Sequence, residues 1–151
     1  MSKSNALETA LLNLLFTNAD IATIGDATGL RGSTTVGSLY LSLHTADPGE
    51  AGTQSTSEIS YTGYARQAVA RTSGNFAVSG NTMSLNVNVD FPEMTGGTGG
   101  TVTHFAVGAE VSGATLVLYK GAVTPTIVVA TGVTPRIKGV PSGTPSTITE
   151  D

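Results

Sequence analysis

The chain of 151 residues contains no cysteine and no tryptophan, and only 12% of its residues are charged. Without cysteine, disulfide bonds, thiolate nucleophiles and cysteine-ligated zinc sites are excluded, so the fold must rest on packing. Basic residues are also scarce, because the chain has only seven lysines and arginines and a formal net charge of -4. These seven are scattered, whereas binding to a phosphate backbone requires a concentrated basic stripe. We therefore expect no nucleic-acid partner.

Long hydrophobic runs are missing as well. The apolar cluster ALLNLLF, residues 10 to 16, is interrupted by Asn13 and is too short to cross a bilayer. No convincing small-residue cleavage pattern follows it, so we expect neither a signal peptide nor a membrane partner. The length suits one domain with one core, and we expect a single domain over residues 1–151.

The first pattern that is present predicts a helix over residues 4–18. Ser4 is a suitable N-cap, and apolar residues recur at the spacing that lines one helix face. That stripe consists of Leu7, Ala10, Leu11, Leu14 and Leu15. The simpler interpretation is that the stripe covers one end of a core. The alternative is that Leu12 and Phe16, which lie off the stripe, contact another subunit.

Residues 19–37 carry four glycines and no sustained period, which indicates a loop. From Ser38 the period changes to two, the pattern of a strand buried on one face. Similar short blocks recur, separated by turn signals, along most of the remaining chain. The predicted strands are 38–44, 64–70, 75–78, 82–91, 101–111, 114–120 and 126–131, with a further edge strand at 136–138.

The connections between these strands are short, as at Ser79-Gly80-Asn81, and they suit antiparallel hairpins. Parallel strands need crossovers of about a dozen residues or more, and no second helical segment is present to provide them. The predicted fold class is therefore all-β: an antiparallel jelly roll or β-sandwich over 38–138 with one N-terminal helix. Residues 139–151 contain two prolines in a polar setting and are predicted to form an extended tail.

The stretch LHTADPGEAGT, residues 43 to 53, is the first place to look for a reactive site. His44 falls on the polar face of its predicted strand, and Asp47-Pro48-Gly49 is a strong turn signal, which explains Asp47 without catalysis. His44 and His104 are the only histidines, too few for a three-histidine zinc site, and Glu50, Asp90 and Glu93 show no metal-binding spacing. We expect no catalytic residue, no metal and no cofactor.

The glycine-rich run MTGGTGGT, residues 94 to 101, resembles a phosphate-binding loop only superficially. It lacks the Lys-Ser/Thr pair of a P-loop, and a predicted strand follows it in place of a helix. It is better interpreted as a flexible connection between sheets.

A contact surface is the remaining candidate kind of site. Tyr61, Tyr64 and Arg66 cluster at the entry of a predicted strand, and aromatic and Arg side chains supply much of the binding energy at interfaces. Equally, these side chains could border a sandwich with their polar ends in water. Arg136 and Lys138, on the predicted edge strand, complete the set of candidate subunit contacts.

Three runs of the sequence resemble structural proteins of tailed bacteriophages. They are YLSLHTADPGEAGTQSTSEISYTGYARQAVAR, VNVDFPEMTGGTGGTVTHFAVG and LVLYKGAVTPTIVVATGVTPRI, with HTADPGE and SYTGYAR the most specific elements. Within that group the chain most resembles the capsid cement, or decoration, proteins of short-tailed phages. The resemblance implies a non-enzymatic jelly roll that forms a homodimer on the capsid exterior. It would bind neighbouring major capsid proteins there and stabilise the head, after assembly in the host cytoplasm.

Two alternatives stay open. Related sequences carry tail-fibre labels, so the chain could instead be a tail-fibre or receptor-binding virion protein, although no internal repeat typical of fibre shafts is visible. A sandwich-based glycan hydrolase would need paired carboxylates across a cleft, which a sequence cannot establish.

Overall fold

The computed structural model describes residues 3–22, 24–26, 29–140 and 147–149. The chain divides into two compact units. Unit 1 comprises residues 1–38, 70–88 and 138–151, and unit 2 comprises residues 39–69 and 89–137. Within the described ranges, no helix combines the length and the apolar character that crossing a membrane requires.

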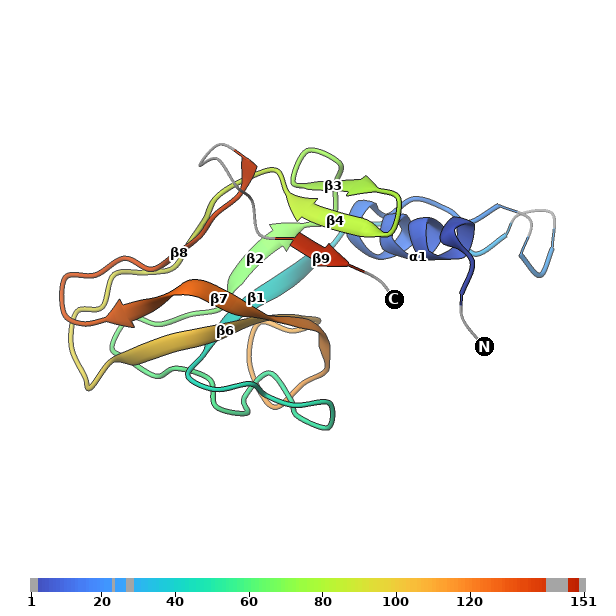
Figure 1. Ribbon diagram of the computed structural model, residues 1–151. Coiled ribbons are helices and arrows are strands. Elements are labelled where there is room, and N and C mark those ends of the chain that lie inside the picture. The colour runs from blue at the N-terminus through green and yellow to red at the C-terminus, as the bar shows by residue number, and fades with distance from the viewer. Residues whose placement is uncertain (1–2, 23, 27–28, 141–146, 150–151) are drawn as a thin grey trace. The chain divides into compact units, whose positions relative to one another are not determined.

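Helix α1 (Asn5–Thr17) opens unit 1 close to the predicted bounds (Figure 1). Ser4 is the N-cap as expected, and its side-chain oxygen accepts a hydrogen bond from the backbone N–H of Leu7 at 3.3 Å. Asn18 ends the helix in the left-handed conformation, with φ of 58°. The guanidinium of Arg71 donates to the carbonyl oxygens of Leu14 and Leu15, at 2.6 Å each, and so occupies two acceptors that the helix itself leaves free.

The core face of α1 is not the predicted one. Leu12 and Phe16 are both 0% exposed, and the ring of Phe16 packs against Phe76 with centroids 5.1 Å apart. The residues of the predicted stripe are each partly exposed. Because the leucines of α1 form one broad face that extends from the predicted stripe to Leu12, its periodicity alone cannot select the buried side. The packing partner in unit 1 selects it.

The strands of unit 1 are β3 (Phe76–Ser79), β4 (Thr82–Leu85) and β9 (Thr147–Thr149), which form an antiparallel sheet in the order β3-β4-β9. The β3–β4 hairpin turns at Gly80 and Asn81, as predicted. β9 lies in the predicted tail, which was expected to contain no strand. Its sequence Thr-Ile-Thr is rich in β-branched residues, which favour an extended strand against the edge of β4. The prolines at 141 and 145 lie outside the described residues.

The predicted loop, residues 19–37, has no regular strand or helix where it is described, but hydrogen bonds hold its two limbs together. The amide of Asn18 donates to the carbonyl of Ser33 and accepts from its N–H, at 2.8 and 2.7 Å. Ile21 and Leu30 exchange two backbone hydrogen bonds. Hydrogen bonds between polar groups therefore shape this segment, which buries few side chains.

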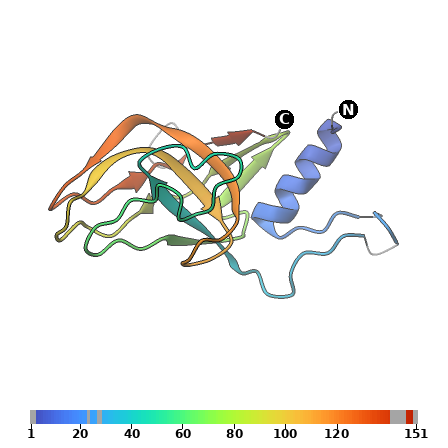
Figure 2. The same ribbon diagram turned by 90° about the horizontal axis from the view of Figure 1, so that it is seen from below.

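Unit 2 is built on a four-stranded sheet in the order β2-β1-β6-β7. Its strands are β1 (Ser38–His44), β2 (Gln67–Ala70), β6 (Gly100–Gly108) and β7 (Val117–Val129). β1 pairs antiparallel with β6, and β6 with β7, with register shifts between Val102 and His104 and at Val107. Figure 2 shows β6 and β7 running together as two long curved strands. The two strands predicted over 114–120 and 126–131 are thus parts of one strand, β7.

A two-stranded antiparallel pair completes unit 2: β5 (Val89–Asp90) with β8 (Arg136–Ile137). β8 falls within the predicted edge strand 136–138. The strand predicted over 82–91 is wrong as one element, because the chain leaves the ladder after Leu85 and re-enters one at Val89. Between them, the N–H of Asn86 donates to the carbonyl of Asn75 and the side chain of Asn88 accepts from Gly139 N–H. Alternation alone could not reveal that break.

The predicted class is confirmed: the protein is mostly β-strand in antiparallel sheets with a single N-terminal helix among the described residues. A β-sandwich is consistent with these sheets. The jelly-roll topology stays a prediction, as does the single domain.

Candidate functional site

The motif SYTGYAR contributes the centre of a buried polar network in unit 2. Arg66 is 6% exposed and precedes β2. Its guanidinium holds Glu58 in a two-point pair, Nε to Oε1 at 2.8 Å and Nη2 to Oε2 at 2.7 Å. The same group donates to the carbonyl oxygens of Glu110 (3.2 Å) and Gly113 (2.8 Å), so one side chain links Glu58 to a segment that is distant in the sequence. The hydrogen bonds with Glu58 raise the pKa of Arg66, which keeps the guanidinium charged.

Tyr64 closes the other side of Glu58. Its hydroxyl donates to Glu58 Oε1 at 2.9 Å and accepts from the backbone N–H of Leu43 in β1 at 3.1 Å. The Tyr64 ring stacks on Phe91, with centroids 6.2 Å apart and planes 2° from parallel. Burial raises the pKa of Tyr64 far above its ordinary value, so the hydroxyl stays protonated and remains a donor. Both carboxylate oxygens of Glu58 are therefore occupied within the protein.

His44 lies at the end of β1 and is fully buried, with 0% exposure. Its Nδ1 lies 2.8 Å from the carbonyl oxygen of Thr56, which can only accept, so Nδ1 carries the proton. Its Nε2 lies 2.9 Å from Ser42 Oγ and accepts from that hydroxyl. Burial lowers the pKa of His44, which favours this neutral form. The expectation of a polar, solvated strand face at His44 is wrong, because residues 54–58 cover it.

Gln54 connects the His44 hydrogen bonds with the Arg66 pair. Its amide nitrogen donates to the carbonyl of Tyr40 at 3.0 Å, and its amide oxygen accepts from Thr115 at 3.0 Å and from Arg66 at 3.4 Å. Gly108, on the neighbouring strand β6, leaves the space for this amide, since a Cβ there would overlap it. Nothing in the sequence around Gln54 distinguishes it from the surrounding turn residues, so sequence reasoning missed it.

Hydrogen bonding in this network is complete. Among the described residues, no buried side-chain nitrogen or oxygen lacks a partner. Burying charge without such partners would cost several kcal/mol, so the network fixes the geometry of the strands and loops around it. Its one carboxylate and one imidazole are both held by protein groups, and the arrangement is that of a structural network.

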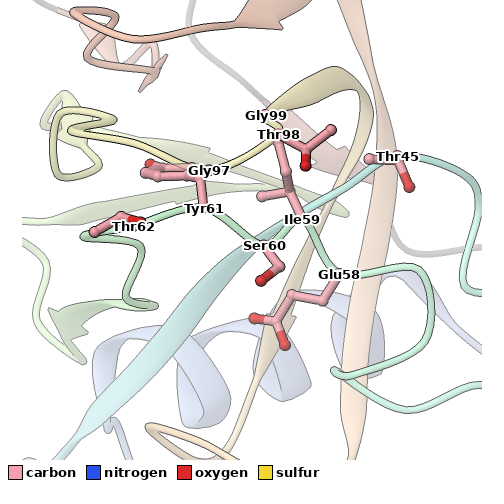
Figure 3. Close-up of a pocket in the computed structure, with 9 residues that line it drawn as sticks. All are labelled: Thr45, Glu58, Ile59, Ser60, Tyr61, Thr62, Gly97, Thr98 and Gly99. Atoms are coloured by element: carbon pink, nitrogen blue, oxygen red, sulfur yellow. The ribbon is translucent and has the colours of Figure 1, made fainter.

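An open hollow lies beside the network, with Glu58 contributing to both. Nine residues line it, from three segments: Thr45 after β1, residues 58–62, and the glycine-rich 97–99 (Figure 3). Its volume is about 630 Å³. Five of the nine residues carry a hydroxyl group, and none is Lys or Arg.

The glycine-rich run forms one wall of this hollow. Thr62 and Gly96 are bridged, with Thr62 N–H donating to the Gly96 carbonyl at 2.8 Å, and Thr95 N–H donates back to Thr62 at 3.1 Å. Gly97 then adopts φ of 92°, a backbone conformation that residues other than glycine rarely adopt. Backbone hydrogen bonds therefore join the run to Thr62, while the flexibility of the connection stays a prediction.

The candidate contact residues fall into three environments. Leu12 and Phe16 lie in the core of unit 1, and neither side chain has surface left for another subunit. Tyr61 is 7% exposed and donates its hydroxyl to the Pro92 carbonyl at 2.8 Å, so it is more core than contact surface, as are Tyr64 and Arg66. Arg136 and Lys138 are exposed. Arg136 makes a two-point pair with Asp90 across β5 and β8, and this pair lowers the pKa of Asp90.

The acidic residues of the HTADPGE motif lie at the surface. Asp47 accepts from Gly49 N–H at 2.8 Å, the turn interaction that the sequence predicted, and this bond lowers the pKa of Asp47. Lys120 of β7 pairs with Asp47 at 3.1 Å and with Glu50 at 3.0 Å. His104 lies opposite His44 in the β1–β6 register and its Nδ1 is 2.9 Å from Thr103 Oγ1. In the part of the chain that is described, no three potential ligands cluster as a metal site.

Comparison with known protein families gives one match. The family described as Podophage GP4 fiber I protein gp80 matches residues 2–139. A search of curated proteins found no match. Because the family model covers most of the chain, the protein belongs to this family of phage fibre proteins.

This membership corrects the cement-protein hypothesis. The expected phage origin and structural role are confirmed at the coarser level: the chain is a structural protein of the bacteriophage virion. The resemblance to capsid cement proteins, and the capsid-stabilising function drawn from it, are wrong, since the matching family consists of fibre proteins. Of the motifs that carried the resemblance, His44, Tyr64 and Arg66 belong to the buried network. Such a network specifies a fold and carries little information on where in the virion that fold is used.

Proposed function

We propose that this protein is a non-enzymatic structural subunit of a fibre on a short-tailed phage. The observation that carries the proposal is the match of residues 2–139 to a podophage fibre protein. The hydrogen-bonded state of Glu58 and His44 supports a structural role, since a general acid or base must be free to exchange a proton with a substrate.

The location can be tested on purified virions with an antibody against this chain. We expect gold label on fibres and a copy number, from quantitative gel densitometry, far below that of the major capsid protein. Label spread evenly over the head, with a copy number close to that of the major capsid protein, would contradict the proposal.

The partners are a separate question. Membership of a fibre family gives no support for binding to the major capsid protein. Self-association stays a prediction, and mass measurement of the purified chain in solution tests it. A polysaccharide incubated with the chain should release no new reducing ends, and release would contradict the non-enzymatic role.

A further inference from the structure

We infer that residues 45–57 form a flap that mild acid releases from β1, with His44 as the group that responds to pH. The flap leaves the sheet after His44 and returns at Glu58, and these two residues form an antiparallel bridge. At its base the N–H of Thr45 donates to the carbonyl of Ser57 at 2.9 Å. This pH response goes beyond the structural fibre role and does not depend on it, because it concerns the fold of unit 2 alone.

Apolar packing contributes little to holding the flap in place. Within the flap, only Pro48 and Gln54 are buried residues. Lys120 of β7 pairs with two exposed acidic side chains of the flap, and surface pairs of this kind add little stability. A segment with few buried apolar contacts opens at a lower free energy than the strands around it. The flap can therefore open while the sheet of unit 2 stays folded.

A chain of hydrogen bonds that all run in one direction fastens the flap to β1. The amide nitrogen of Gln54 donates to Ser42 Oγ at 3.4 Å, and the Ser42 hydroxyl donates to His44 Nε2 at 2.9 Å. His44 Nδ1 then donates to the carbonyl of Thr56 at 2.8 Å. Arg66 can only donate, so it fixes the amide oxygen of Gln54 on its own side and the amide nitrogen toward Ser42. The chain thus begins and ends on the flap.

A second proton on His44 reverses the middle bond of this chain. Nε2 becomes a donor toward Ser42 Oγ, which already accepts from Gln54. The Ser42 hydroxyl then loses its acceptor, and both Ser42 and Gln54 have 0% exposure, so water cannot replace it. A buried donor without an acceptor is unfavourable. Opening the flap removes this conflict, because water can then bond to all three side chains.

The groups that face His44 do not compensate for its second proton. Burial lowers the pKa of His44 most, and the charges of Arg66 and of His104, its cross-strand neighbour on β6, lower it further. The Thr56 carbonyl and Glu58 act in the opposite direction with smaller effect, and the two-point pair with Arg66 neutralises Glu58. An open flap, with His44 in water, binds the proton more readily than a closed one. Opening is therefore favoured as the pH falls below 6.5, the ordinary pKa of histidine.

Native-state hydrogen exchange of the full chain, followed by NMR at pH 7.5, 6.5 and 5.5 in low concentrations of urea, tests the inference. The amides of Gln54 and Thr56 donate to the carbonyls of Thr115 and Thr53, so their exchange reports on the flap. After correction for intrinsic exchange rates, their protection should fall by up to about tenfold between pH 7.5 and 5.5. They should also exchange faster, and with less dependence on urea, than the ladder amides of β6.

Two controls separate this response from other effects of acid. The amides of Ile21 and Leu30, which bond to each other in unit 1, should keep their protection over the same pH range. His44→Gln removes the titrating group and should abolish the pH dependence of the flap amides. His104→Gln is the matched variant, because His104 lies outside the chain of hydrogen bonds, and it should keep most of that dependence.

Several outcomes would overturn the inference. In the unmodified protein, these are exchange of the flap amides only together with the β6 amides, at equal urea dependence, or protection that does not change with pH. Among the variants, they are a pH dependence that survives in His44→Gln or disappears in His104→Gln. None of these outcomes depends on where the antibody places the protein on the virion.

Discussion

Unit 1 and unit 2 both hold short strands in place without disulfides, but they do so by different interactions. In unit 1, α1 packs Leu12 and Phe16 on Phe76, and the helix ends are closed by Ser4 and Arg71. In unit 2, an apolar sheet core is combined with the buried network around Arg66. Apolar packing tolerates small adjustments, whereas a buried ion pair requires defined partners. We therefore expect unit 2 to be the less tolerant of polar substitution.

The largest expected effect is on unit 2. Arg66→Met leaves the part-buried Glu58 without its cation and removes donors from the carbonyls of Glu110 and Gly113. We expect the free energy of unfolding to fall by about 3–5 kcal/mol, measured by urea denaturation.

Arg136→Met is the matched control for that substitution. Arg136 makes a similar two-point pair with Asp90, but both side chains are about half exposed. Its removal should cost at most about 1 kcal/mol. Equal losses for the two arginines would contradict the idea that burial gives the Arg66 pair its importance.

A second prediction tests the core of unit 1. Leu12→Ala removes a side chain with 0% exposure and should cost about 3 kcal/mol, within the range for buried leucines. Leu14→Ala, on the stripe that the sequence favoured, should cost clearly less, because Leu14 is partly exposed. Thermal or urea denaturation of both variants decides between the two helix faces, and a larger loss for Leu14→Ala would reverse our assignment.

A third prediction concerns the pH dependence of stability. It applies to unit 2, because His44 belongs to that unit. Burial lowers the pKa of His44 in the folded state below 6.5, its ordinary value. The unfolded chain therefore binds the proton first as the pH falls. Stability should be fully present above pH 6.5 and should decrease below it, by at most about 1.4 kcal/mol per pH unit.

The physical reason lies in the bonds of His44. A proton on Nε2 would have to donate to Ser42 Oγ, and the Ser42 hydroxyl would then lose its own acceptor. Urea denaturation between pH 7.5 and about 5 measures the slope. In His44→Gln the decrease just below pH 6.5 should largely disappear. An unchanged slope in that variant would assign the pH dependence to other groups.

The smallest expected effect is at the helix N-terminus in unit 1. Ser4→Ala removes the hydrogen bond to Leu7 N–H and should cost about 0.5–1 kcal/mol. Ser4→Thr keeps a capping hydroxyl and should restore most of the loss. Loss of the same size in both variants would mean that the cap contributes little.

Several elements could be predicted from sequence because their signals are local. The N-cap at Ser4, the turn at Asp47 and the period-two run of β1 depend on neighbouring residues, and each was found where expected. The same local signals cannot show what covers a strand. His44 alternates like a solvent-facing residue, and only the return of residues 54–58 over β1 buries it.

In the candidate site, too, some features could be predicted from sequence and others could not. Tyr61, Tyr64 and Arg66 were singled out by residue type, but sequence left open whether they face a partner or the core. Glu58, which bonds to both Tyr64 and Arg66, and Gln54, which bonds to Arg66, lie within twelve residues of Arg66 in the chain, yet no spacing rule connects them. Side-chain networks depend on directions in space, which a one-dimensional pattern does not record.

By itself, the sequence determined the fold class, the N-terminal helix and most strand positions, since capping residues and hydrophobic alternation are local patterns of the sequence. Only the tertiary structure decided which face of α1 is buried, where the 82–91 segment breaks, and that His44, Tyr64 and Arg66 belong to an interior network. Those outcomes follow from contacts between residues far apart in sequence, whose free energies exist only once the chain has folded.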